Sequence, residues 1–414
     1  MRKLPPSVGL LLVMLVFASS GVLAREKVLY QFPGGSGGNE PQAGLVFDSK
    51  GDAYGITYYG GTYGWGTVFR LEQSNRGWTE QIIYSFLGSS DGKNPVGNLL
   101  IDATGNLYGT TEYGGNGIGC PQGSYNCGGT VFQLAQTNGR WKLLVLYTFC
   151  SLSSCTDGSN PNGLTSDKAG NLYGTTAGGG QQCANGCGTV YELSPSHGSW
   201  KEKILHAFNN NGDGIHPSPR ITLDKSGNLY GTTCCGGGYG DGLVFALKPA
   251  KKGWKEVMIY AFDGTSYNNA FPNGSLTIDS AGNIFGTTPG YYNQCPTGCG
   301  MVFKLSRSNG QWVESAVYTF DGTHGANPNP GFILDSAGHF YGSTILGGKS
   351  NFGEVFELKP GETWTIKLLY NFTGQGDDAS ANPGLTFGPG GGLYGTTPGN
   401  SYQQYEGEVF ELIQ

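Results

Sequence analysis

Short apolar runs alternate with glycine-rich or polar turns along almost the whole chain. The runs are four to eight residues long and rich in Val, Ile, Tyr, Phe and Thr, which favour extended strands. The turns between them carry Gly, Asn, Asp and Pro, the residues that reverse a chain most readily. One stretch shows the full pattern, with predicted strands at residues 99–102, 107–111, 129–134 and 143–149.

The same order of four predicted strands recurs seven times, at a mean spacing of about 57 residues. Each copy contains Tyr-Gly-x-Thr or a close variant, whose aromatic positions are Tyr54, Tyr108, Tyr173, Tyr230, Phe285, Tyr341 and Tyr394. Four short strands per repeat are typical of one propeller blade. We therefore predict an all-β fold, a seven-bladed β-propeller with four-stranded blades that forms a single domain over residues 25–414.

The outermost predicted strand shows how the ring closes. In six copies it reads Trp, five residues, Tyr or His, one residue, Phe, as in Trp141, Tyr147 and Phe149. The even spacing predicts that all three rings share one face of the strand. The seventh copy has no such strand after it, but residues 26–32 near the N-terminus match its Tyr-x-Phe end. We predict that they complete the last blade and leave no open sheet edge.

Composition narrows the class of protein. The 74 Gly and 20 Pro exclude a helical bundle, whereas 24 Tyr, 21 Phe and 7 Trp can fill a core and argue against disorder. The formal charge is −6, and it becomes −8 when the first 24 residues, with Arg2 and Lys3, are removed. Because nucleic-acid binding depends on Lys and Arg, we expect no nucleic-acid partner.

Residues 1–24 are typical of a secretory signal, with a charged start, an apolar stretch at 8–18 and a cut before Arg25. The apolar stretch is too short for a membrane span, and no later one is long enough. No Cys follows the cut, so a lipid anchor there is not expected. These features predict a secreted protein, extracellular or periplasmic, without a membrane span, and we expect a monomer.

The repeat unit itself resembles a known family. Its pattern is Gly-Leu-x-x-Asp-x-x-Gly-Asn-Leu-Tyr-Gly-Thr-Thr-x-x-Gly-Gly, followed by Gly-Thr-Val-Phe-x-Leu. This is similar to the tandem repeat of the bacterial GloVer family, and the likeness covers roughly residues 26–414. The resemblance implies an exported or surface-attached protein with a repeat architecture, and it implies no particular activity. Members have varied C-terminal anchors, whereas this chain ends within a predicted strand.

The ten cysteines fall into close pairs, and in an exported chain such pairs favour disulfides. We predict the bonds Cys120–Cys127, Cys150–Cys155, Cys183–Cys187, Cys234–Cys235 and Cys295–Cys299. Zinc is the alternative, but none of the five His lies beside a Cys pair. We therefore expect no metal site of this kind. A bond between the adjacent Cys234 and Cys235 would form a hard, flat patch suited to a functional surface.

The loops sort by length onto the two faces of the ring. Turns after the first and third strands are short and define a short-turn face, and loops after the second and fourth strands define a long-loop face. Binding residues usually lie on such long loops. The aromatic residues there suit stacking against sugars or a protein partner, although they can also pack on their own loops. The candidate binding residues are Tyr58, Tyr59, Trp65, Tyr113, Cys234, Cys235, Tyr239, Tyr291 and Tyr292.

One position departs from the repeat. Four residues before the Asp that ends the first strand, the copies carry small or neutral residues, except for Arg220. At the mouth of the central channel, Arg220 would offer a forked donor to an anionic or hydroxyl-rich ligand, unless it pairs with a nearby Asp. With His216 and Asp213, it is also a candidate catalytic residue. Converging loop carboxylates could bind calcium, but no EF-hand-like string exists, so no cofactor is expected.

The strand-ending Asp residues have a simpler interpretation. They lie at Asp48, Asp102, Asp167, Asp224, Asp279 and Asp335, each before a Gly-containing turn, and we expect them to accept backbone N–H bonds within that turn. Gly388 replaces Asp in the seventh copy, so chemistry that needs a complete ring of carboxylates is not expected.

Three functions remain open from the sequence. The first is a secreted propeller that binds a glycan or another extracellular or envelope partner through the long-loop face, without catalysis. The second is a polysaccharide hydrolase or lyase with its site at the mouth of the channel. The third is a purely structural surface protein. Propellers perform all three roles, so the fold cannot decide between them.

Overall fold

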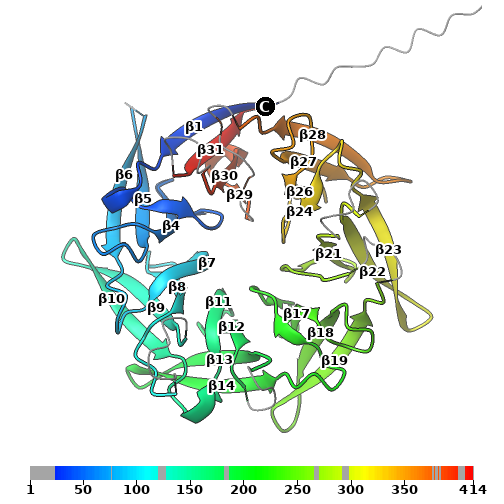
Figure 1. The fold of residues 1–414 in the computed structure, drawn as a ribbon, viewed down its shortest axis with the longest axis horizontal. Helices are drawn as coiled ribbons and strands as arrows, with labels where there is room; N and C mark the ends of the chain where they lie inside the picture. Colours follow the sequence, from blue (N-terminus) through cyan, green and yellow to red (C-terminus); the bar gives the residue numbers. More distant parts are fainter. Residues whose placement is uncertain are drawn as a thin grey trace, which may run out of the picture.

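The computed structural model describes residues 24–75, 77–119, 127–180, 186–264, 270–290, 298–374, 377, 381, 384–399 and 406–413. Its strands form seven antiparallel sheets arranged in a ring around a central channel (Figure 1). The predicted all-β, seven-bladed propeller is therefore confirmed. Each blade has four strands from the channel outward, except that in three blades the innermost strand is split into two short pieces.

The first four blades contain the following strands, from the innermost outward. Blade 1 has β2 (Asn39–Pro41) and β3 (Val46–Phe47), β4 (Ala53–Tyr59), β5 (Thr67–Ser74) and β6 (Gly77–Ser85). Blade 2 has β7 (Lys93–Ile101), β8 (Leu107–Tyr113), β9 (Thr130–Thr137) and β10 (Arg140–Thr148). Blade 3 has β11 (Ser159–Ser166), β12 (Leu172–Gly178), β13 (Thr189–Ser196) and β14 (Ser199–Ala207). Blade 4 has β15 (Ile215–Pro217) and β16 (Thr222–Leu223), β17 (Leu229–Cys235), β18 (Leu243–Pro249) and β19 (Trp254–Ala261).

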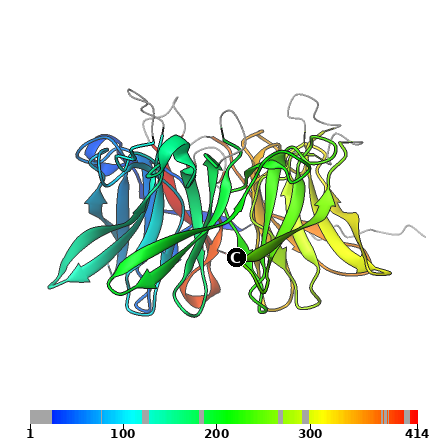
Figure 2. The same cartoon turned by 90° about the horizontal axis from the view of Figure 1, so that it is seen from below.

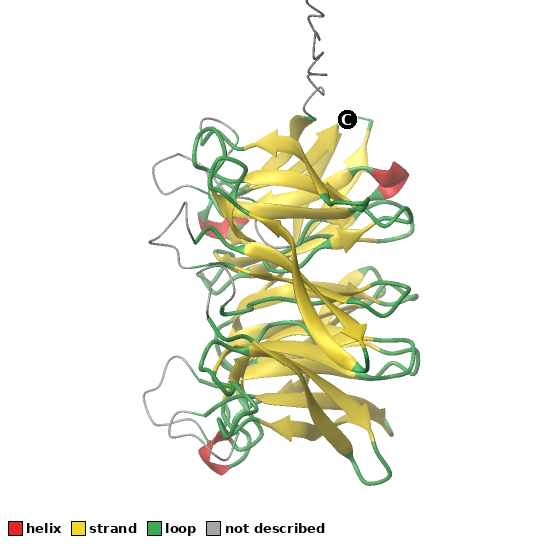
Figure 3. Ribbon diagram, turned by 90° about the vertical axis from the view of Figure 1, so that its right-hand side faces the viewer, coloured by secondary structure: helices red, strands yellow, loops and turns green. Residues whose placement is uncertain are grey.

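The remaining blades follow the same order. Blade 5 has β20 (Thr277–Ile278), β21 (Ile284–Thr288), β22 (Met301–Ser308) and β23 (Gln311–Thr319). Blade 6 has β24 (Ala326–Pro328) and β25 (Ile333–Leu334), β26 (Phe340–Leu346), β27 (Glu354–Lys359) and β28 (Thr365–Asn371). Blade 7 has β29 (Thr386–Phe387), β30 (Leu393–Thr397), β31 (Glu408–Ile413) and, outermost, β1 (Arg25–Gln31). Figure 3 shows how few helical turns accompany these strands; the described ones are the 3-10 turns η1 (Gly35–Gly37), η2 (Ser153–Cys155) and η4 (Pro389–Gly391).

The two ends of the chain close the ring as predicted. Strand β1 pairs antiparallel with β31, so that Val28 lies opposite Phe410 and Gln31 opposite Glu408. The predicted strand at residues 26–32 thus differs from β1 by one residue at each end. Phe32, which follows β1, is fully buried and packs edge-on against Phe69 of blade 1. The closure therefore joins the last blade to the first through both backbone pairing and an aromatic contact.

The outer strands correct one prediction, because their three aromatic rings do not share a face. Each outer strand has a register shift just before its Tyr or His, as between Ile82 and Tyr84 in β6. The same shift occurs in β1, β10, β14, β19, β23 and β28. Such a bulge inserts one extra residue and reverses which side chains face which way. Trp141 consequently packs on Tyr54 of the preceding blade, whereas Phe86 packs on Phe132 of the following one.

A close approach inside each blade explains the invariant pattern of the second and third strands. The Gly of Tyr-Gly-x-Thr lies against the aromatic ring of Gly-Thr-Val-Phe on the next strand. A Cβ at Gly109 would lie 2.6 Å from Cζ of Phe132, and one at Gly231 would lie 2.6 Å from Cζ of Phe245. Phe132 and Phe245 are fully buried. The absence of a side chain at this Gly is therefore what lets the ring fill the blade.

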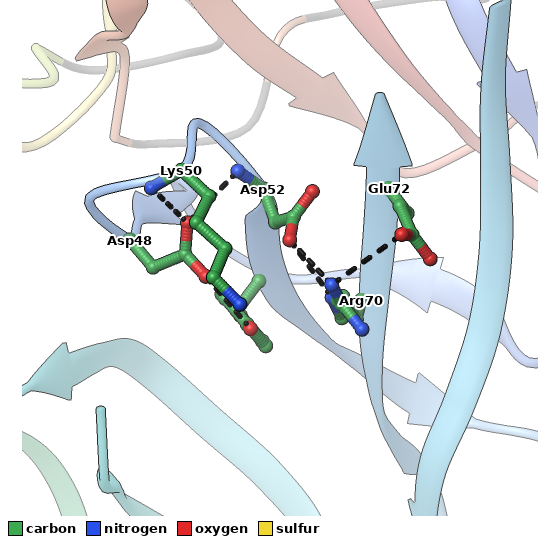
Figure 4. A network of polar contacts seen from close by, with 6 residues as sticks. Asp48, Lys50, Asp52, Arg70 and Glu72 are labelled. Carbon is green, nitrogen blue, oxygen red and sulfur yellow. Dashed lines mark hydrogen bonds and ion pairs between the residues drawn. The ribbon is translucent and has the colours of Figure 1, made fainter. Parts of the chain in front are cut away.

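The loops gather at the two faces of the ring, which is seen from the side in Figure 2. On the short-turn face, the six strand-ending Asp side chains accept backbone N–H bonds from residues two and four positions later, at 2.8 to 3.0 Å. Figure 4 shows this arrangement at Asp48, beside the ion pair of Arg70 with Asp52. These residues hold their own turns, as predicted. No helix in the described part of the chain is long and apolar enough to cross a membrane.

Candidate functional site

The central channel contains a cavity of about 560 Å³ lined by the innermost strands of the seven blades and by the segments next to them. Most of the lining consists of Gly, Pro and aliphatic residues, with Phe332 and Phe387 as the aromatic members. The polar uncharged residues are Gln42, Asn98, Asn162, Ser275 and Thr386. Among the described residues that line the cavity, Arg220 is the only charged one. This composition is typical of small-molecule sites, in which a few polar groups stand in an apolar wall.

Arg220 lies between β15 and β16, the two pieces of the innermost strand of blade 4. Its guanidinium forms no hydrogen bond or ion pair with any described residue, so the predicted alternative of pairing with an Asp is not found there. The side chain is accessible to solvent within the channel, yet the surrounding wall lowers its pKa by desolvation. Arg220 is thus a cation that faces the channel without a matching anion among the described residues.

His216 and Asp213 lie in the same loop as Arg220 but are held in other contacts. Nδ1 of His216 lies 2.7 Å from the carbonyl oxygen of Ala177 in the preceding blade. The backbone of His216 has positive φ, and its N–H donates to the carbonyl of Cys187. Asn94 makes the equivalent side-chain contact to the carbonyl of Tyr58, also with positive φ. His216 therefore takes the place of this Asn in the repeat.

Asp213 is a loop-holding carboxylate. Its Oδ2 lies 3.1 Å from Nε2 of His206, and its oxygens also accept the backbone N–H of Asn209. Asp91 does the same in blade 1, where it accepts from the Tyr84 hydroxyl and the N–H of Leu87. Of the three candidate catalytic residues, only Arg220 lines the cavity. A catalytic role for these residues stays a prediction.

Four of the candidate binding residues do lie together, in what we call the aromatic patch, formed by Tyr58, Tyr59, Trp65, Lys93, Glu112 and Tyr113. It lies on the long-loop face between blades 1 and 2. Lys93 connects it, because its Nζ lies 4.8 Å from the ring centroid of Trp65 and 5.7 Å from that of Tyr113. These are cation–π distances. The Lys93 side chain is buried, and desolvation lowers its pKa, whereas the Trp65 ring is 38% exposed.

A short hydrogen bond ties the rest of the patch together. The Tyr58 hydroxyl donates to Oε2 of Glu112 at 2.6 Å, across the gap between the two blades. Burial and this bond raise the pKa of Tyr58, and burial followed by a bond to Glu112 raises the pKa of Tyr113 to about 12. Tyr59 stands edge-on to Tyr58, with centroids 4.6 Å apart, and is 42% exposed. Because their pKa values are raised, the hydroxyls of Tyr58 and Tyr113 remain protonated donors at neutral pH.

The other candidate binding residues lie elsewhere. Cys234 and Cys235 end β17 in blade 4, across the ring from blade 1 (Figure 1), and Tyr239 is 68% exposed in the following loop. The structure thus separates these three residues from the aromatic patch. Tyr291 and Tyr292 lie outside the described residues.

The predicted disulfides can be checked where the structure describes both cysteines of a pair. The predicted bonds Cys150–Cys155 and Cys234–Cys235 are confirmed. Cys127, Cys187 and Cys299 are also disulfide-bonded, while their predicted partners Cys120, Cys183 and Cys295 lie outside the described residues. Within the described ranges, one group of three metal-ligand side chains comes together: Cys127, Cys150 and Cys155. Because these sulfurs are held in disulfides, they do not form a thiolate site.

Sequence reasoning missed Lys93 and Glu112. A signal for Lys93 was present, since the residue at its place in the other copies is uncharged: Asn39, Ser159, Ile215, Ala270, Ala326 and Ala381. The same comparison of copies singled out Arg220. Glu112 occupies the repeat position of Tyr58 in the next blade, so their contact follows from the ring geometry.

The family is shown by a model described as the Gloeobacter/Verrucomicrobia repeat, which matches residues 16–120, 117–295 and 275–414. The chain belongs to this family of repeat proteins, in agreement with the resemblance of its repeat unit. A search of curated proteins finds no match.

Several solved structures share the fold. A polysaccharide lyase, the PL25 ulvanlyase, aligns with a TM-score of 0.56 at 11% identity, over 94% of this chain and 96% of its own. The same lyase bound to -[GlcA(1-4)Rha3S]- gives a TM-score of 0.55. The extracellular domain of the B. thetaiotaomicron protein BT4673 aligns with a TM-score of 0.55 at 12% identity, over 92% of this chain. This chain spans about 40% of that protein's length. At such low identity, these likenesses extend to the fold alone.

Proposed function

We propose that this chain is an exported glycan-binding protein that holds a carbohydrate against the aromatic patch. The observation that carries the proposal is the half-exposed Trp65 ring fixed over the buried Lys93 ammonium. An exposed aromatic face suits stacking on the apolar side of a sugar ring, and neighbouring hydroxyl and carboxylate groups suit its hydroxyls. Glu112, Tyr58 and Tyr113 supply such groups beside the ring.

The patch is already ordered before a ligand arrives. Lys93 lies within cation–π distance of two rings, the backbone N–H of Asn94 donates to the carbonyl of Trp65, and Tyr58 is bonded to Glu112. A surface that is held in place loses less conformational entropy on binding, so more of the contact energy remains as affinity. The order of the patch therefore favours a role in recognition, rather than a role in which the aromatic side chains only pack on their own loops.

Binding without catalysis is favoured over hydrolysis or elimination by the contacts of the candidate catalytic residues. Asp213 is bonded to His206 and His216 to Ala177, and both contacts have equivalents in blades 1 and 2 that hold loops. Export is supported by the disulfides, which persist in oxidising compartments. The lyase that shares the fold was solved with an acidic oligosaccharide, which makes carbohydrate the first ligand class to test.

The test compares Trp65→Ala with a matched control in the chain from Arg25 to Gln414. Binding is measured by affinity electrophoresis and calorimetry against a panel of neutral and acidic plant and bacterial polysaccharides. We expect at least one polysaccharide to bind. Trp65→Ala should weaken its affinity by about tenfold or more, as for an aromatic hot spot. The control Leu144→Ala removes another exposed apolar side chain, 52% exposed on outer strand β10, and should bind as the parent does. Equal binding by Trp65→Ala, or capture of only a protein partner from envelope fractions, would contradict the proposal.

A further inference from the structure

The central channel carries a feature that the aromatic patch does not use. Arg220 lines a cavity of about 560 Å³ that contains no other charged residue among its described lining. An Arg that faces a channel without an opposite charge can bind an anionic group with its planar fork of N–H donors. No described residue supplies an opposite charge to Arg220. Among its described lining residues, the channel therefore carries one unpaired positive charge, which favours a ligand with one negative charge.

The neutral side chains around the cavity have free hydrogen-bonding capacity. Gln42, Asn98, Asn162 and Ser275 line it from four different blades, and their side chains form no hydrogen bond with described residues. An amide offers both donors and an acceptor, and a Ser hydroxyl can do either. Such groups suit the hydroxyls of a sugar, and the half-buried aliphatic side chains of Val46 and Leu100, which also line the cavity, suit its C–H faces.

The charge and geometry of Arg220 favour one kind of anionic group. A guanidinium presents two parallel N–H donors in a plane, which match the two oxygens of a carboxylate. One carboxylate neutralises the single positive charge of Arg220, whereas a phosphate monoester would bring surplus negative charge. The volume lies within the usual range of about 300–1,000 Å³ for small-ligand sites, enough for one or two sugar units.

We propose that the central channel is a binding site for the carboxylate of a uronic acid, with Arg220 as the fork that holds the carboxylate. The choice of a sugar acid rests on the proposed glycan-binding function, but the recognition of a carboxylate rests on the channel alone. The ligand can be a free uronic acid or a uronate unit of an oligosaccharide, because both present the same group.

The experiment titrates the chain from Arg25 to Gln414 with D-galacturonate, with trigalacturonate and with neutral D-galactose, by calorimetry at low salt. We expect at least one of the two acids to bind and galactose not to bind. Binding of galacturonate assigns the site to a free sugar acid, and binding of trigalacturonate alone assigns it to an oligosaccharide unit. Absence of binding by both acids, or equal binding of galactose, would overturn the proposal.

Two variants test the role of Arg220. Arg220→Ser introduces the residue that blade 5 carries at this position, Ser275, so the ring should tolerate it, and a thermal melt checks the fold. Arg220→Ser should weaken the affinity for the acid at least tenfold. Arg220→Lys should weaken this affinity less, because the positive charge remains while the two parallel N–H donors are lost. The control Arg140→Ser removes an exposed charge at the start of β10 and should change nothing. Unchanged affinity in Arg220→Ser would overturn the assignment.

The two proposals fail separately. If the channel binds acids and the aromatic patch does not bind glycans, Arg220→Ser abolishes the binding of galacturonates while Trp65→Ala leaves all binding unchanged. If only the patch binds glycans, Trp65→Ala weakens the binding of polysaccharides and Arg220→Ser leaves that binding unchanged.

Discussion

Asp102 accepts N–H bonds from Thr104 and Asn106 and the hydroxyl of Tyr108. Burial alone would raise its pKa, but these bonds to the charged form lower it below 3.8, and the same holds at Asp167, Asp224 and Asp335. The pKa values of other carboxyls shift in the opposite direction. Desolvation raises the pKa of Glu80, Glu202 and Glu354 to about 7, and the nearby Asp157 adds to the effect at Glu202.

The carboxyls with lowered pKa and those with raised pKa together predict how the stability of the fold depends on pH. A carboxyl with a lowered pKa contributes stability above its unfolded value, and the contribution is lost as pH falls through the folded pKa. A carboxyl with a raised pKa holds its proton in the fold between about 4.5 and 7, so stability falls as pH rises through that window. His206, whose pKa burial lowers, acts in the other direction, but it is one group against six carboxyls, since burial also raises the pKa of Glu40, Glu256 and Glu314. We expect the melting temperature to be highest near pH 4.5–5.

The check is a series of thermal melts from pH 3 to pH 8. Glu202→Gln should flatten part of the fall between pH 5 and pH 7, because it removes one carboxyl that ionises late. The matched control Glu362→Gln changes an exposed carboxyl and should leave the profile as it is. A melting temperature that rises steadily from pH 4.5 to pH 7 would contradict this account.

At the scale of strands, the repeat predicts pairing well and side-chain direction less well. The seven blades, their order and the closure by β1 follow from turn residues and the spacing of apolar runs. The bulge in each outer strand could not be predicted, because the inserted residue is an ordinary aliphatic one, such as Ile83 or Leu146, that continues the apolar run. Similarly, residues that meet across two blades, such as Tyr58 and Glu112, are 54 positions apart, and only the ring geometry joins them.

The close approach between the second and third strands predicts the effect of one added methyl group. In Gly109→Ala, the new Cβ would lie 2.6 Å from the buried Phe132 ring and 2.9 Å from Leu99, so the core must shift. We expect a loss of about 1–3 kcal/mol in the free energy of unfolding, as for other overpacked cores. Urea denaturation measures it. Gly238→Ala is the control, since nothing lies within 4 Å of its added Cβ; equal stability of the two variants would count against the packing argument.

For the whole molecule, stability depends on joining blade 7 to blade 1. Phe32 lies at this junction, fully buried against Phe69, and the backbone around it bonds to Glu406 and Gly407. A ring that opens here would expose the edge of β31, which invites pairing with other chains. The junction also holds the channel together, because blade 7 contributes Thr386 and Phe387 to the cavity wall.

Phe32→Ala should therefore cost about 3–5 kcal/mol of stability, as for other buried Phe residues, and promote aggregation near the melting temperature. Thermal unfolding followed by light scattering measures both effects. Val28→Ala, on the same strand but 36% exposed, is the matched control and should melt close to the parent. If Phe32→Ala melts at the same temperature as Val28→Ala, closure of the ring through β1 contributes little to stability.

We propose that this propeller binds acidic carbohydrate without cleaving it. The most direct measurement incubates the chain from Arg25 to Gln414 with acidic polysaccharides, and records binding by calorimetry and new reducing ends in the same mixtures. We expect binding that Trp65→Ala or Arg220→Ser weakens, with no new reducing ends over hours. New reducing ends that disappear in Arg220→Ser would contradict it and make the channel a catalytic site.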